Sequence, residues 1–499
     1  MTPQDAYRNL SEHSKQRTVV SSINALVEWD QQVYMPPAGL EHRGAMSAWL
    51  AKQSHTLATD ANIRKWLDIA ADGEWTEGEQ ACLREWKRSY DKATCLPDDL
   101  VEREATVATK AHESWREARE KNDFSIFADD LSTLVDISRE KADRYGYKNE
   151  SYDALLDLYQ ADMTVESVGA IFTDLRSRLV PLLDKILDWQ GEPATNPFNG
   201  ICLEDEQHRF CEWGARAIGF DFNAGRLDKT VHPFCTGTCI GDVRLTTRFD
   251  VNNPLPAFSG ALHEAGHGVY EQGLLVEHQG TPLGDSVSLG VHESQSLFNE
   301  SVLGQSVEFW TYALPFLKAH FPGRADHIDL DTISRFVNRV ERSFIRVDAD
   351  EVTYPLHVIL RFEIERDLFR GDVAINDLPE LWRTKMQELL GVVPDTDSLG
   401  VLQDVHWSFN GFGYFPTYAL GRLYAAQLAQ ALTAAHPDWR DNLKNGDCST
   451  ALNWMRENVH RQGMRYRTEQ LIERATGTAP SADAYLTYLE DKYSSIYAS

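Results

Sequence analysis

The stretch His263-Glu264-Ala265-Gly266-His267 decides how the rest of this 499-residue chain is interpreted. Because an α-helix has 3.6 residues per turn, the two histidines project from one face and their imidazoles converge on a single metal ion. Glu264 then projects beside a metal-bound water molecule. The neighbouring stripe of the same helix is apolar and consists of Phe258, Leu262, Ala265 and Val269. The pattern predicts a helix that buries one side and presents two metal ligands on the adjoining side.

Glu293 is the predicted third metal ligand, and it lies 26 residues after His267 in the stretch His292-Glu293-Ser294-Gln295-Ser296. The intervening segment contains Gly273, Gly280 and Gly284. These glycines permit one helix to end and the chain to turn back with a carboxylate. Two histidines and a carboxylate leave the fourth tetrahedral position of Zn²⁺ open for water, as in catalytic sites. Co²⁺ and Mn²⁺ accept the same donors, so we expect one divalent ion per subunit, with Zn²⁺ preferred.

The charge and the cysteines of the chain limit its partners and its compartment. Forty-nine basic against 76 acidic residues give a formal net charge of -27, which opposes binding to nucleic acid and to anionic membranes. The same field favours a bound cation or a positively charged substrate group, although it is equally compatible with a general role in solubility. Seven cysteines without a spaced framework indicate reduced thiols. Together with a polar amino terminus and no long apolar run, they predict a cytoplasmic protein.

Helical periodicity dominates the chain, and neither an internal repeat nor a low-complexity linker divides it. The clearest helix spans 378–390, after a capping box at 377–380 and before a glycine. Two further amphipathic helices are expected at 100–118 and 168–182, the second of them bent at its internal proline. We therefore expect a mainly α fold that forms one large helical body with a groove.

Two short segments near the metal motif alternate with the period of a β-strand. Residues 242–249 place an apolar side chain at every second position, and 287–291 alternate similarly just before Glu293. We expect a small antiparallel sheet beside the metal helix, which would hold an extended peptide through backbone hydrogen bonds. A purely structural hairpin with a solvated polar face is the alternative.

Several separated motifs match one known family in the same order. They are 242–246 for D-x-R-x-T, 263–267 for H-E-x-x-H, 292–296 for H-E-S-Q-S, 345–350 for I-R-x-x-A-D and 400–407 for G-x-x-Q-D-x-H-W. Trp29-Asp30, Met35-Pro36 and Arg43 match the amino-terminal signature, and 413–418 match a late aromatic segment. Over essentially its whole length the chain resembles the carboxypeptidase Taq family of metallocarboxypeptidases. Leu297 departs from the pattern, because a basic residue is expected after the H-E-S-Q-S stretch.

The resemblance implies one gluzincin-like peptidase domain over 1–499, with a deep groove between two lobes and the metal at its base. Residues 1–230 would form a mostly helical lobe and groove wall, 231–420 the metal and substrate-binding core, and 421–499 the carboxy-terminal helices. The resemblance also implies a homodimer that removes single residues from the free carboxyl termini of peptides. Broad specificity with reluctance at proline is expected on the same ground.

Glu264 is the expected general base, which takes a proton from the metal-activated water and returns it to the leaving amine. The oxyanion of the tetrahedral intermediate needs a hydrogen-bond donor besides the metal. Tyr414, Tyr418 and His232 are candidates for that donor, and the sequence does not rank them. Core packing explains these aromatic side chains about as well.

A carboxypeptidase also needs a cation for the free carboxylate of its substrate, and the paired donors of arginine suit that task. Arg346 is the first choice and Arg244 the second. The alternative for Arg346 is an ion pair with Asp348 or Asp350 that fastens two helices. The residues expected to line the groove or to brace the metal ligands are Gln403, Asp404, His406 and Trp407.

Three other functions compete with this interpretation. A helical zinc oligopeptidase would share H-E-x-x-H and a downstream glutamate, but the motifs around Arg346 and Gln403 favour a carboxypeptidase. A catalytically silent, metal-containing peptide-binding protein would have no need of Glu264 as a base. A serine hydrolase is disfavoured because no G-x-S-x-G motif accompanies Asp404 and His406.

Overall fold

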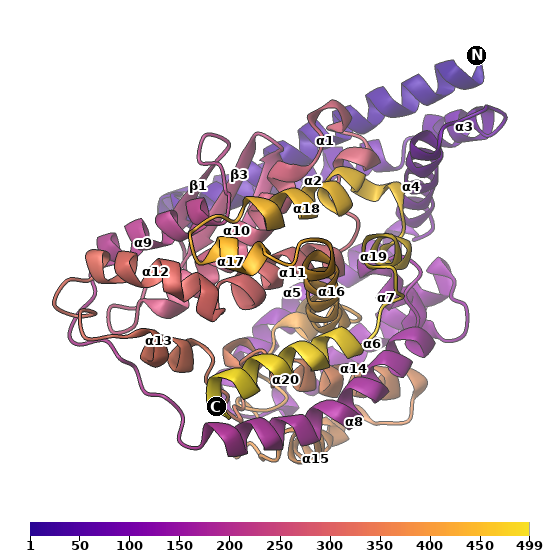
Figure 1. The fold of residues 1–499 in the computed structure, drawn as a ribbon. Helices are drawn as coiled ribbons and strands as arrows, with labels where there is room; N and C mark the ends of the chain where they lie inside the picture. Colours follow the sequence, from indigo (N-terminus) through magenta and orange to yellow (C-terminus); the bar gives the residue numbers. More distant parts are fainter. Residues whose placement is uncertain (499) are drawn as a thin grey trace.

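The computed structural model describes residues 1–498, and within them helices make up most of the chain around one small sheet (Figure 1). The expected mainly α fold is confirmed. The helices are α1 (Pro3–Val33), α2 (Leu40–Ala58), α3 (Ala61–Ala70), α4 (Glu77–Thr94), α5 (Asp98–Lys121), α6 (Ser125–Tyr145), α7 (Ser151–Tyr159), α8 (Val165–Gln190), α9 (Glu204–Ala217), α10 (Leu255–Gly273), α11 (Leu289–Leu297), α12 (Val307–His320), α13 (Leu330–Val337), α14 (Tyr354–Arg370), α15 (Leu378–Leu390), α16 (Pro416–Ala435), α17 (Trp439–Leu443), α18 (Ser449–Asn458), α19 (Thr468–Thr476) and α20 (Asp483–Tyr497). The strands are β1 (Gly225–Lys229), β2 (Cys235–Cys239) and β3 (Asp242–Thr247). Short 3₁₀ segments are η1 (Pro37–Gly39), η2 (Val276–His278), η3 (Pro282–Gly284), η5 (Arg346–Asp348), η6 (Ile375–Asp377), η7 (His406–Phe409) and η8 (His460–Arg465), whereas η4 (Phe298–Leu303) is π-helical.

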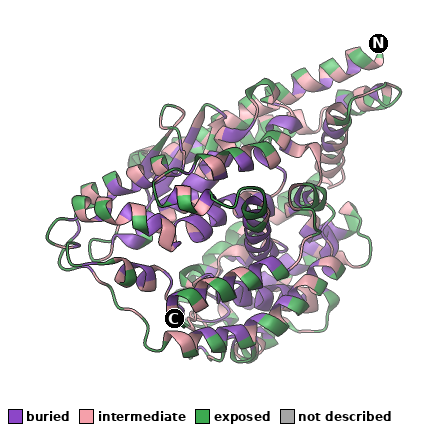
Figure 2. Ribbon diagram, in the orientation of Figure 1, coloured by how far each residue is buried: buried purple, intermediate pink, exposed green. Residues whose placement is uncertain are grey.

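Helices α1 to α4 form a unit with a small core of its own. Helix α1 begins at Thr2, whose hydroxyl accepts the backbone N–H of Asp5 in a capping box, and Pro3 follows in the first turn. The buried side chains of this core are Ala6, Leu10, Ile63, Ala70, Ala81, Cys82, Trp86 and, from η3, Leu283. The unit projects from the larger body, and much of its surface is exposed (Figures 1 and 2). A second, much larger core holds the remaining elements together.

Helix α16 lies at the centre of that larger core. Almost every residue from Pro416 to Leu432 is buried, including the polar Gln427 and Tyr424. A helix that is buried on all sides must satisfy its polar groups locally, and Tyr424 accordingly accepts a hydrogen bond from Gln160. Helix α16 packs against α11, and α11 packs against α10. The buried helix α16 therefore supports α11 directly, and through α11 it supports α10.

The sheet has the order β1-β3-β2 and lies against α10, as the sequence predicted for its position. Strand β3 buries Val243 and Leu245, in agreement with the alternation in 242–249. The expectation of a purely antiparallel sheet is wrong, because β3 pairs antiparallel with β2 but parallel with β1. A short turn joins β2 to β3, so that pair is a hairpin. Strand β1 takes the other edge of β3 and runs in the same direction.

Residues 287–291 do not form the predicted strand. Helix α11 begins at Leu289, because the hydroxyl of Ser288 caps it by accepting the backbone N–H of Val291. Val287 and Val291 are buried, whereas Leu289 is partly exposed. Three alternating residues fit the period of a strand and the start of a helix equally well, and the serine cap decides between them.

The predicted helices at 100–118, 168–182 and 378–390 all exist, as parts of α5, α8 and α15. Helix α8 continues through Pro181 to Gln190, so it is longer than predicted. Helix α15 ends at Gly391, whose φ of 69° is the left-handed conformation that favours glycine. The capping box expected at 377–380 does not form, because the side chain of Asp377 makes no capping hydrogen bond. No helix within residues 1–498 is long and apolar enough to cross a membrane.

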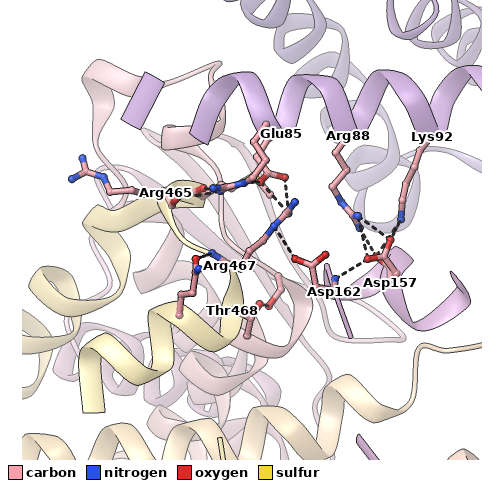
Figure 3. Close-up of polar contacts among 12 residues, drawn as sticks. Glu85, Arg88, Lys92, Asp157, Asp162, Arg465, Arg467 and Thr468 are labelled. Atoms are coloured by element: carbon pink, nitrogen blue, oxygen red, sulfur yellow. Dashed lines mark hydrogen bonds and ion pairs between the residues drawn. The ribbon is translucent and has the colours of Figure 1, made fainter. Parts of the chain in front are cut away.

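A network of charged side chains joins α4 to two distant parts of the chain (Figure 3). Arg88 and Lys92 of α4 pair with Asp157 of α7 at 2.8 and 2.6 Å. Glu85 of α4 pairs at 3.0 Å with Arg467, which precedes α19. Arg467 also pairs with Asp162 at 3.1 Å. The projecting unit is thus tied to the larger body by ion pairs as well as by apolar contact.

Candidate metal centre

His263 and His267 on α10 and Glu293 on α11 converge on one point. One nitrogen of each histidine and one oxygen of the carboxylate all lie within 4.8 Å of one another. The Glu293 Oε2 atom is 3.8 Å from His263 Nε2 and 3.5 Å from His267 Nε2. Ligands at about 2.0–2.1 Å around a tetrahedral ion would be separated by about 3.3 Å. The three side chains therefore fit a divalent ion such as Zn²⁺ after small shifts, and no cysteine takes part.

Two glycines allow the helices to come close enough for this convergence. A Cβ atom on Gly266 would lie 2.5 Å from the Gln295 carbonyl oxygen and 2.7 Å from Ser296 Cα. A Cβ atom on Gly421 of α16 would lie 2.7 Å from Glu293 Cγ. Because α10 and α16 both touch α11 at positions without side chains, Glu293 is clamped between them.

Glu300 orients His263 from the side opposite the metal. Its Oε2 atom lies 2.8 Å from His263 Nδ1, and its Oε1 atom accepts a hydrogen bond of 3.0 Å from the Ser259 hydroxyl. A carboxylate at Nδ1 keeps the proton there and leaves the Nε2 lone pair for a metal. Sequence reasoning missed Glu300, although its position seven residues, or two helical turns, after Glu293 was a usable signal.

His267 is held by a second chain of hydrogen bonds. Its Nδ1 atom lies 3.1 Å from the carbonyl oxygen of His292 and 2.6 Å from Nδ1 of the same residue. His292 Nε2 in turn lies 2.8 Å from Glu271 Oε1. Both candidate ligand histidines therefore have their Nδ1 atom occupied, which fixes the orientation of each ring. Sequence analysis did not identify Glu271 in this role.

The electrostatics of the centre favour a cation between the three ligands. Burial lowers the pKa of His263, but the charges of Glu293 and Glu300 outweigh burial and raise that pKa to about 10. Burial lowers the pKa of His267 to about 4, so this imidazole is neutral and ready to bind a metal. Burial opposes ionisation of Glu293, yet His263 and His267 lower its pKa to about 2. Carboxylates that retain a proton on His263 would equally stabilise a divalent ion beside it.

Glu264 lies beside the ligands without joining them. Its side chain is only 7 % exposed, and burial raises its pKa to about 7. Within the described residues its carboxylate makes no hydrogen bond or ion pair, and it does not belong to the converging set. A buried carboxylate with a pKa near neutrality is suited to accept and return a proton.

Arg346 is only 4 % exposed and is held by Asp404. Its Nε and Nη2 atoms donate to Asp404 Oδ1 at 3.0 and 2.8 Å, and its Nη1 donates to the Tyr354 hydroxyl. Burial opposes ionisation of Asp404, but Arg361 and Arg346 hold its pKa well below the ordinary value. The alternative of an ion pair between Arg346 and Asp348 or Asp350 is therefore wrong.

Gln403 and Trp407 were also expected in this region. Gln403 contacts Arg346, whereas Trp407 lies in the core. The side-chain oxygen of Gln403 accepts hydrogen bonds from the Arg346 backbone and from Arg361, at 2.9 and 2.8 Å. Trp407 is buried and donates to Glu365 at 2.7 Å, which places its indole in the supporting core. Arg361 and Glu365, both fully buried on α14, were missed by sequence reasoning.

Tyr418, itself a candidate oxyanion donor, lies next to both Arg346 and Tyr414. The Arg346 guanidinium lies 5.0 Å from the centre of the Tyr418 ring, and the rings of Tyr414 and Tyr418 are 5.2 Å apart. His406 Nε2 lies 3.4 Å from the Tyr418 hydroxyl. His232, in contrast, is exposed between β1 and β2 and makes no side-chain hydrogen bond among residues 1–498.

Arg244 lies on β3 with its guanidinium already paired. Its Nη2 atom is 2.8 Å from Asp242 Oδ2, and the charge lies 4.2 Å from the centre of the Trp29 ring. The three residues come from the D-x-R-x-T motif and from the amino-terminal signature. These two motifs, more than 200 residues apart in sequence, therefore meet where α1 approaches the sheet.

Comparison with known proteins gives consistent full-length similarity. The chain matches the sequence model described as Carboxypeptidase Taq (M32) metallopeptidase over residues 9–493. It is 40 % identical to "Thermostable carboxypeptidase 1" of Thermus thermophilus over 100 % of both chains, and 36 % identical to "Carboxypeptidase 1" of Bacillus subtilis over 96 % of both. The crystal structure of an M32 carboxypeptidase from Deinococcus radiodurans superimposes with a TM-score of 0.96 at 37 % identity, covering 99 % of this chain and 100 % of that one. Metallocarboxypeptidase 1 of Trypanosoma cruzi gives 0.94 at 35 % identity, over 98 % and 99 %.

Proposed function

The chain belongs to the carboxypeptidase Taq (M32) family of metallopeptidases, and from this premise we propose that its catalytic centre is built on His263, His267 and Glu293. The protein is a metal-dependent carboxypeptidase whose substrates are peptides. The observation that carries the assignment of the site is the convergence of these three ligand atoms within 4.8 Å, with Glu264 buried beside them.

The cofactor is a divalent metal ion, and we propose Zn²⁺ with Co²⁺ or Mn²⁺ as substitutes. Two imidazoles and one carboxylate are the donor set of open, catalytic zinc sites. An ion bound in this way lowers the pKa of a coordinated water to about 7 and polarises the carbonyl group of the scissile bond. The chain contributes fixed ligand rings, through Glu300 at His263 and His292 at His267.

Glu264 acts as the general base in this proposal. Its carboxylate takes a proton from the attacking water and delivers it to the nitrogen of the departing residue. Two features support the role. The residue follows a metal ligand directly on α10, and its carboxylate has no partner elsewhere in the described chain that would hold it away from the site.

Tyr414 and Tyr418 are the better-supported donors for the oxyanion. Burial raises the pKa of both phenols, and the nearby charge of Glu293 adds to the effect, which indicates that both lie close to the metal ligands. A protonated phenol is the form that donates a hydrogen bond to a developing negative charge. His232 stays a candidate only if its exposed segment approaches the site during turnover.

Arg346 remains the proposed residue for the free carboxylate of the substrate, with Arg244 second. Three of the five N–H groups of Arg346 are used by Asp404 and Tyr354, so two are available. Gln403, Asp404 and His406 position this guanidinium and Tyr418, and Trp407 supports them from the core. The measurement that separates the arginines is discrimination between free-acid and amidated peptides, which is expected to be lost in Arg346→Ala.

We also propose a homodimer, a single peptidase domain and a cytoplasmic location. Six large apolar side chains are exposed on α1 and α2, namely Val19, Ile23, Leu26, Leu40, Met46 and Trp49. They support a homodimer that covers them. We also propose one peptidase domain over 1–499, with 1–230 as helical lobe and groove wall, 231–420 as core and 421–499 as closing helices. The unpaired cysteines support a reducing, cytoplasmic location.

The decisive experiment combines metal analysis with product analysis. We expect purified protein to bind one divalent ion per chain and to shorten a defined peptide one residue at a time from its carboxyl end. A chelator should abolish this release and Zn²⁺ should restore it. Internal cleavage products would instead indicate an oligopeptidase.

Glu264→Gln tests the base separately from the metal site. The variant should retain the ion while kcat falls by about 10³-fold or more, because general-base catalysis contributes about 10²–10⁴-fold. Glu293→Gln is the matched variant that should lose metal affinity instead. Normal turnover by Glu264→Gln would overturn the assignment, and metal binding without turnover by the wild-type protein would favour a silent binding protein.

A further inference from the structure

Two buried arginines share a single carboxylate, which leaves a local excess of positive charge. Arg346 Nη2 lies 2.8 Å from Asp404 Oδ1, and Arg361 Nε donates to Asp404 Oδ2 at 2.6 Å. Their side chains are only 4 % and 0 % exposed. No other carboxylate of residues 1–498 forms an ion pair with either arginine. Because buried charge without a counterion is costly, this cluster favours the arrival of another anion.

Arg422 of α16 brings a third guanidinium close to the same place. It lies 4.7 Å from the centre of the Tyr354 ring, and it is 8 % exposed. Its Nε atom is buried without a hydrogen-bond partner in the described chain, and its Nη1 reaches only the Ser301 hydroxyl, at 3.5 Å. The charge of Arg346 is 5.5 Å from the centre of the same ring. Tyr354 therefore lies beside two cations.

Tyr354, the first residue of α14, has a hydroxyl proton that is not used within the chain. Its oxygen accepts a hydrogen bond from Arg346 Nη1. Since a guanidinium can only donate, the O–H of the phenol must be directed at another atom. Among residues 1–498 no atom accepts it, and the side chain is half-buried, so part of it reaches the surface. The phenol can thus donate to a molecule that binds beside Arg346.

Tyr354 also begins a series of three neighbouring phenols. Its ring centre is 6.0 Å from that of Tyr418, which is 5.2 Å from that of Tyr414. Burial raises the pKa of all three, and the charge of Glu293 adds to this effect, although Arg346 and Arg422 oppose it at Tyr354. All three therefore keep their protons at neutral pH. Tyr354 is the member bonded to Arg346, whereas the other two are the candidates for the oxyanion.

We propose that the Tyr354 phenol donates a hydrogen bond to the terminal carboxylate of the substrate, alongside Arg346, and so helps to select peptides with a free carboxyl end. The inference rests on the proposed function, because only an enzyme that acts at this end needs the contact. A carboxylate oxygen supplies the acceptor that Tyr354 lacks, and its charge balances the second guanidinium that Asp404 leaves uncompensated. An amidated end offers an oxygen but no charge, so its hydrogen bond is weaker.

The variant Tyr354→Phe removes this hydroxyl and keeps the ring. The substrates are a dipeptide with a blocked amino end, as the free acid and as the carboxy-terminal amide. We expect kcat/KM of the zinc-loaded variant for the free acid to fall by about 10–100-fold, mainly through KM, because a hydrogen bond to a charged group is lost. For the amide it should change by less than about threefold. Zinc affinity should equal that of the wild-type protein.

Tyr147→Phe is the matched control. It removes an exposed hydroxyl that donates to Asp143 at 3.1 Å, and it should keep the wild-type kinetics for both substrates. Equal losses for the acid and the amide in Tyr354→Phe would overturn the inference, as would no loss for either. Failure of the wild-type enzyme to release any terminal residue, with zinc bound, would instead refute the proposed function and the inference together.

A double-variant cycle separates direct contact from an effect through Arg346. The probe is a dipeptide acid in which a CH₂–NH group replaces the scissile amide, and its binding to the metal-free protein is measured by isothermal titration. If Tyr354 touches the carboxylate, Tyr354→Phe should weaken binding further in an Arg346→Ala background, by about threefold or more. No further loss there would mean that Tyr354 only positions the arginine, which would overturn the inference.

Discussion

Glu300 is the side chain whose removal should reveal how the metal site is held. The pair between its carboxylate and His263 Nδ1, at 2.8 Å, fixes the ring of this proposed metal ligand and adds negative charge behind it. We expect Glu300→Ala to weaken metal binding by about 10–100-fold, the usual effect of losing such a partner. Glu300→Gln should lose less, because its amide oxygen still accepts the Nδ1–H. Isothermal titration with Zn²⁺ measures both.

Ser259→Ala is the control for the variants of Glu300. It removes only the 3.0 Å hydrogen bond that steadies Glu300 and leaves the carboxylate opposite His263 in place. Its zinc affinity should stay within about threefold of wild type, because a single neutral hydrogen bond contributes about 0.5–1.5 kcal/mol and acts here only indirectly. Equal affinities in all four proteins would show that Glu300 has no part in holding the metal site.

The residues of the centre show what a sequence can and cannot predict. His263, Glu264, His267 and Glu293 were predicted because metal chemistry demands these residue types at a fixed helical spacing. Their partners obey no such spacing. Glu300 acts from a π-helical segment, and Glu271 acts through His292, so each contact depends on how α10 and α11 pack. Outer partners of this kind become visible only with coordinates.

His357 makes the stability of the protein sensitive to acid. It is fully buried on α14, and burial, reinforced by the charge of Arg361, holds its pKa well below 6.5. Arg346 acts in the same direction and Asp404 opposes it. Below pH 6.5 the unfolded chain therefore binds more protons than the folded chain, by up to one. From this residue alone, stability should fall with decreasing pH by about 0.7 kcal/mol per unit at pH 6.5 and by about 1.2 kcal/mol per unit at pH 5.5.

The variant His357→Leu should flatten that pH dependence. Urea unfolding at pH 6.5, 6.0 and 5.5 gives the slope for each protein, and the difference between the two slopes isolates the histidine. The metal ligands are the same in both proteins, so their own titration cancels from the difference. Parallel slopes over this interval would mean that His357 is not kept neutral by its surroundings.

At the scale of elements, Gly266 sets the distance between α10 and α11. A methyl group at this position would lie within 2.7 Å of backbone atoms of Gln295 and Ser296, and backbone atoms cannot move aside locally. We expect Gly266→Ala to lower the free energy of unfolding by about 1–3 kcal/mol and to weaken zinc binding, because α11 carries Glu293. Chemical unfolding and zinc titration measure the two effects.

Gly260 provides a matched control on the same helix. A Cβ atom there would meet only the Thr247 hydroxyl, at 3.9 Å, which is an ordinary contact. Gly260→Ala should therefore stabilise the protein by up to about 1 kcal/mol, since alanine favours helix over glycine. Equal effects of the two substitutions would show that helix propensity, and not the close approach of α10 and α11, decides the outcome.

Comparison of the predicted and observed elements shows which of them a sequence pattern can identify. Helix α15 was predicted within a residue at each end because its apolar period, its proline and Gly391 all agree. Residues 287–291 were assigned to a strand because three residues are too few to separate a period of 2 from one of 3.6. The direction of β1 relative to β3 could not be predicted from the sequence, because it depends on which edge of the sheet the strand joins.

At the scale of the whole molecule, the projecting unit α1–α4 has a core separate from that of the larger body. It is attached through contacts of α1 with β2, through contacts of α4 with η3 and η8, and through the ion pairs around Glu85 and Asp157 (Figure 3). Sequence analysis did not separate this unit, because no linker or low-complexity segment marks its boundary. Only the three-dimensional contacts divide them.

Arg467 is the residue through which this attachment can be tested. Its ion pair with Glu85 is mostly buried, with the carboxylate side chain only 8 % exposed. Removing the arginine leaves that carboxylate with Arg84 alone, and stranding one member of a buried pair is more costly than never having the pair. We expect Arg467→Met to destabilise the protein by about 2 kcal/mol and to raise hydrogen exchange in α3 and α4 more than in α14 and α16.

The double variant Arg467→Met/Glu85→Met should recover much of that loss, because an apolar contact replaces the stranded charge. Arg178→Met is the matched control: its partners Asp174 and Asp483 are exposed, and surface pairs of this kind contribute about 0–1 kcal/mol. Hydrogen exchange that rises equally in α4 and α16 would mean that the projecting unit and the larger body unfold as one. A local rise confined to α3 and α4 would mean that the unit can detach while the metal centre stays intact.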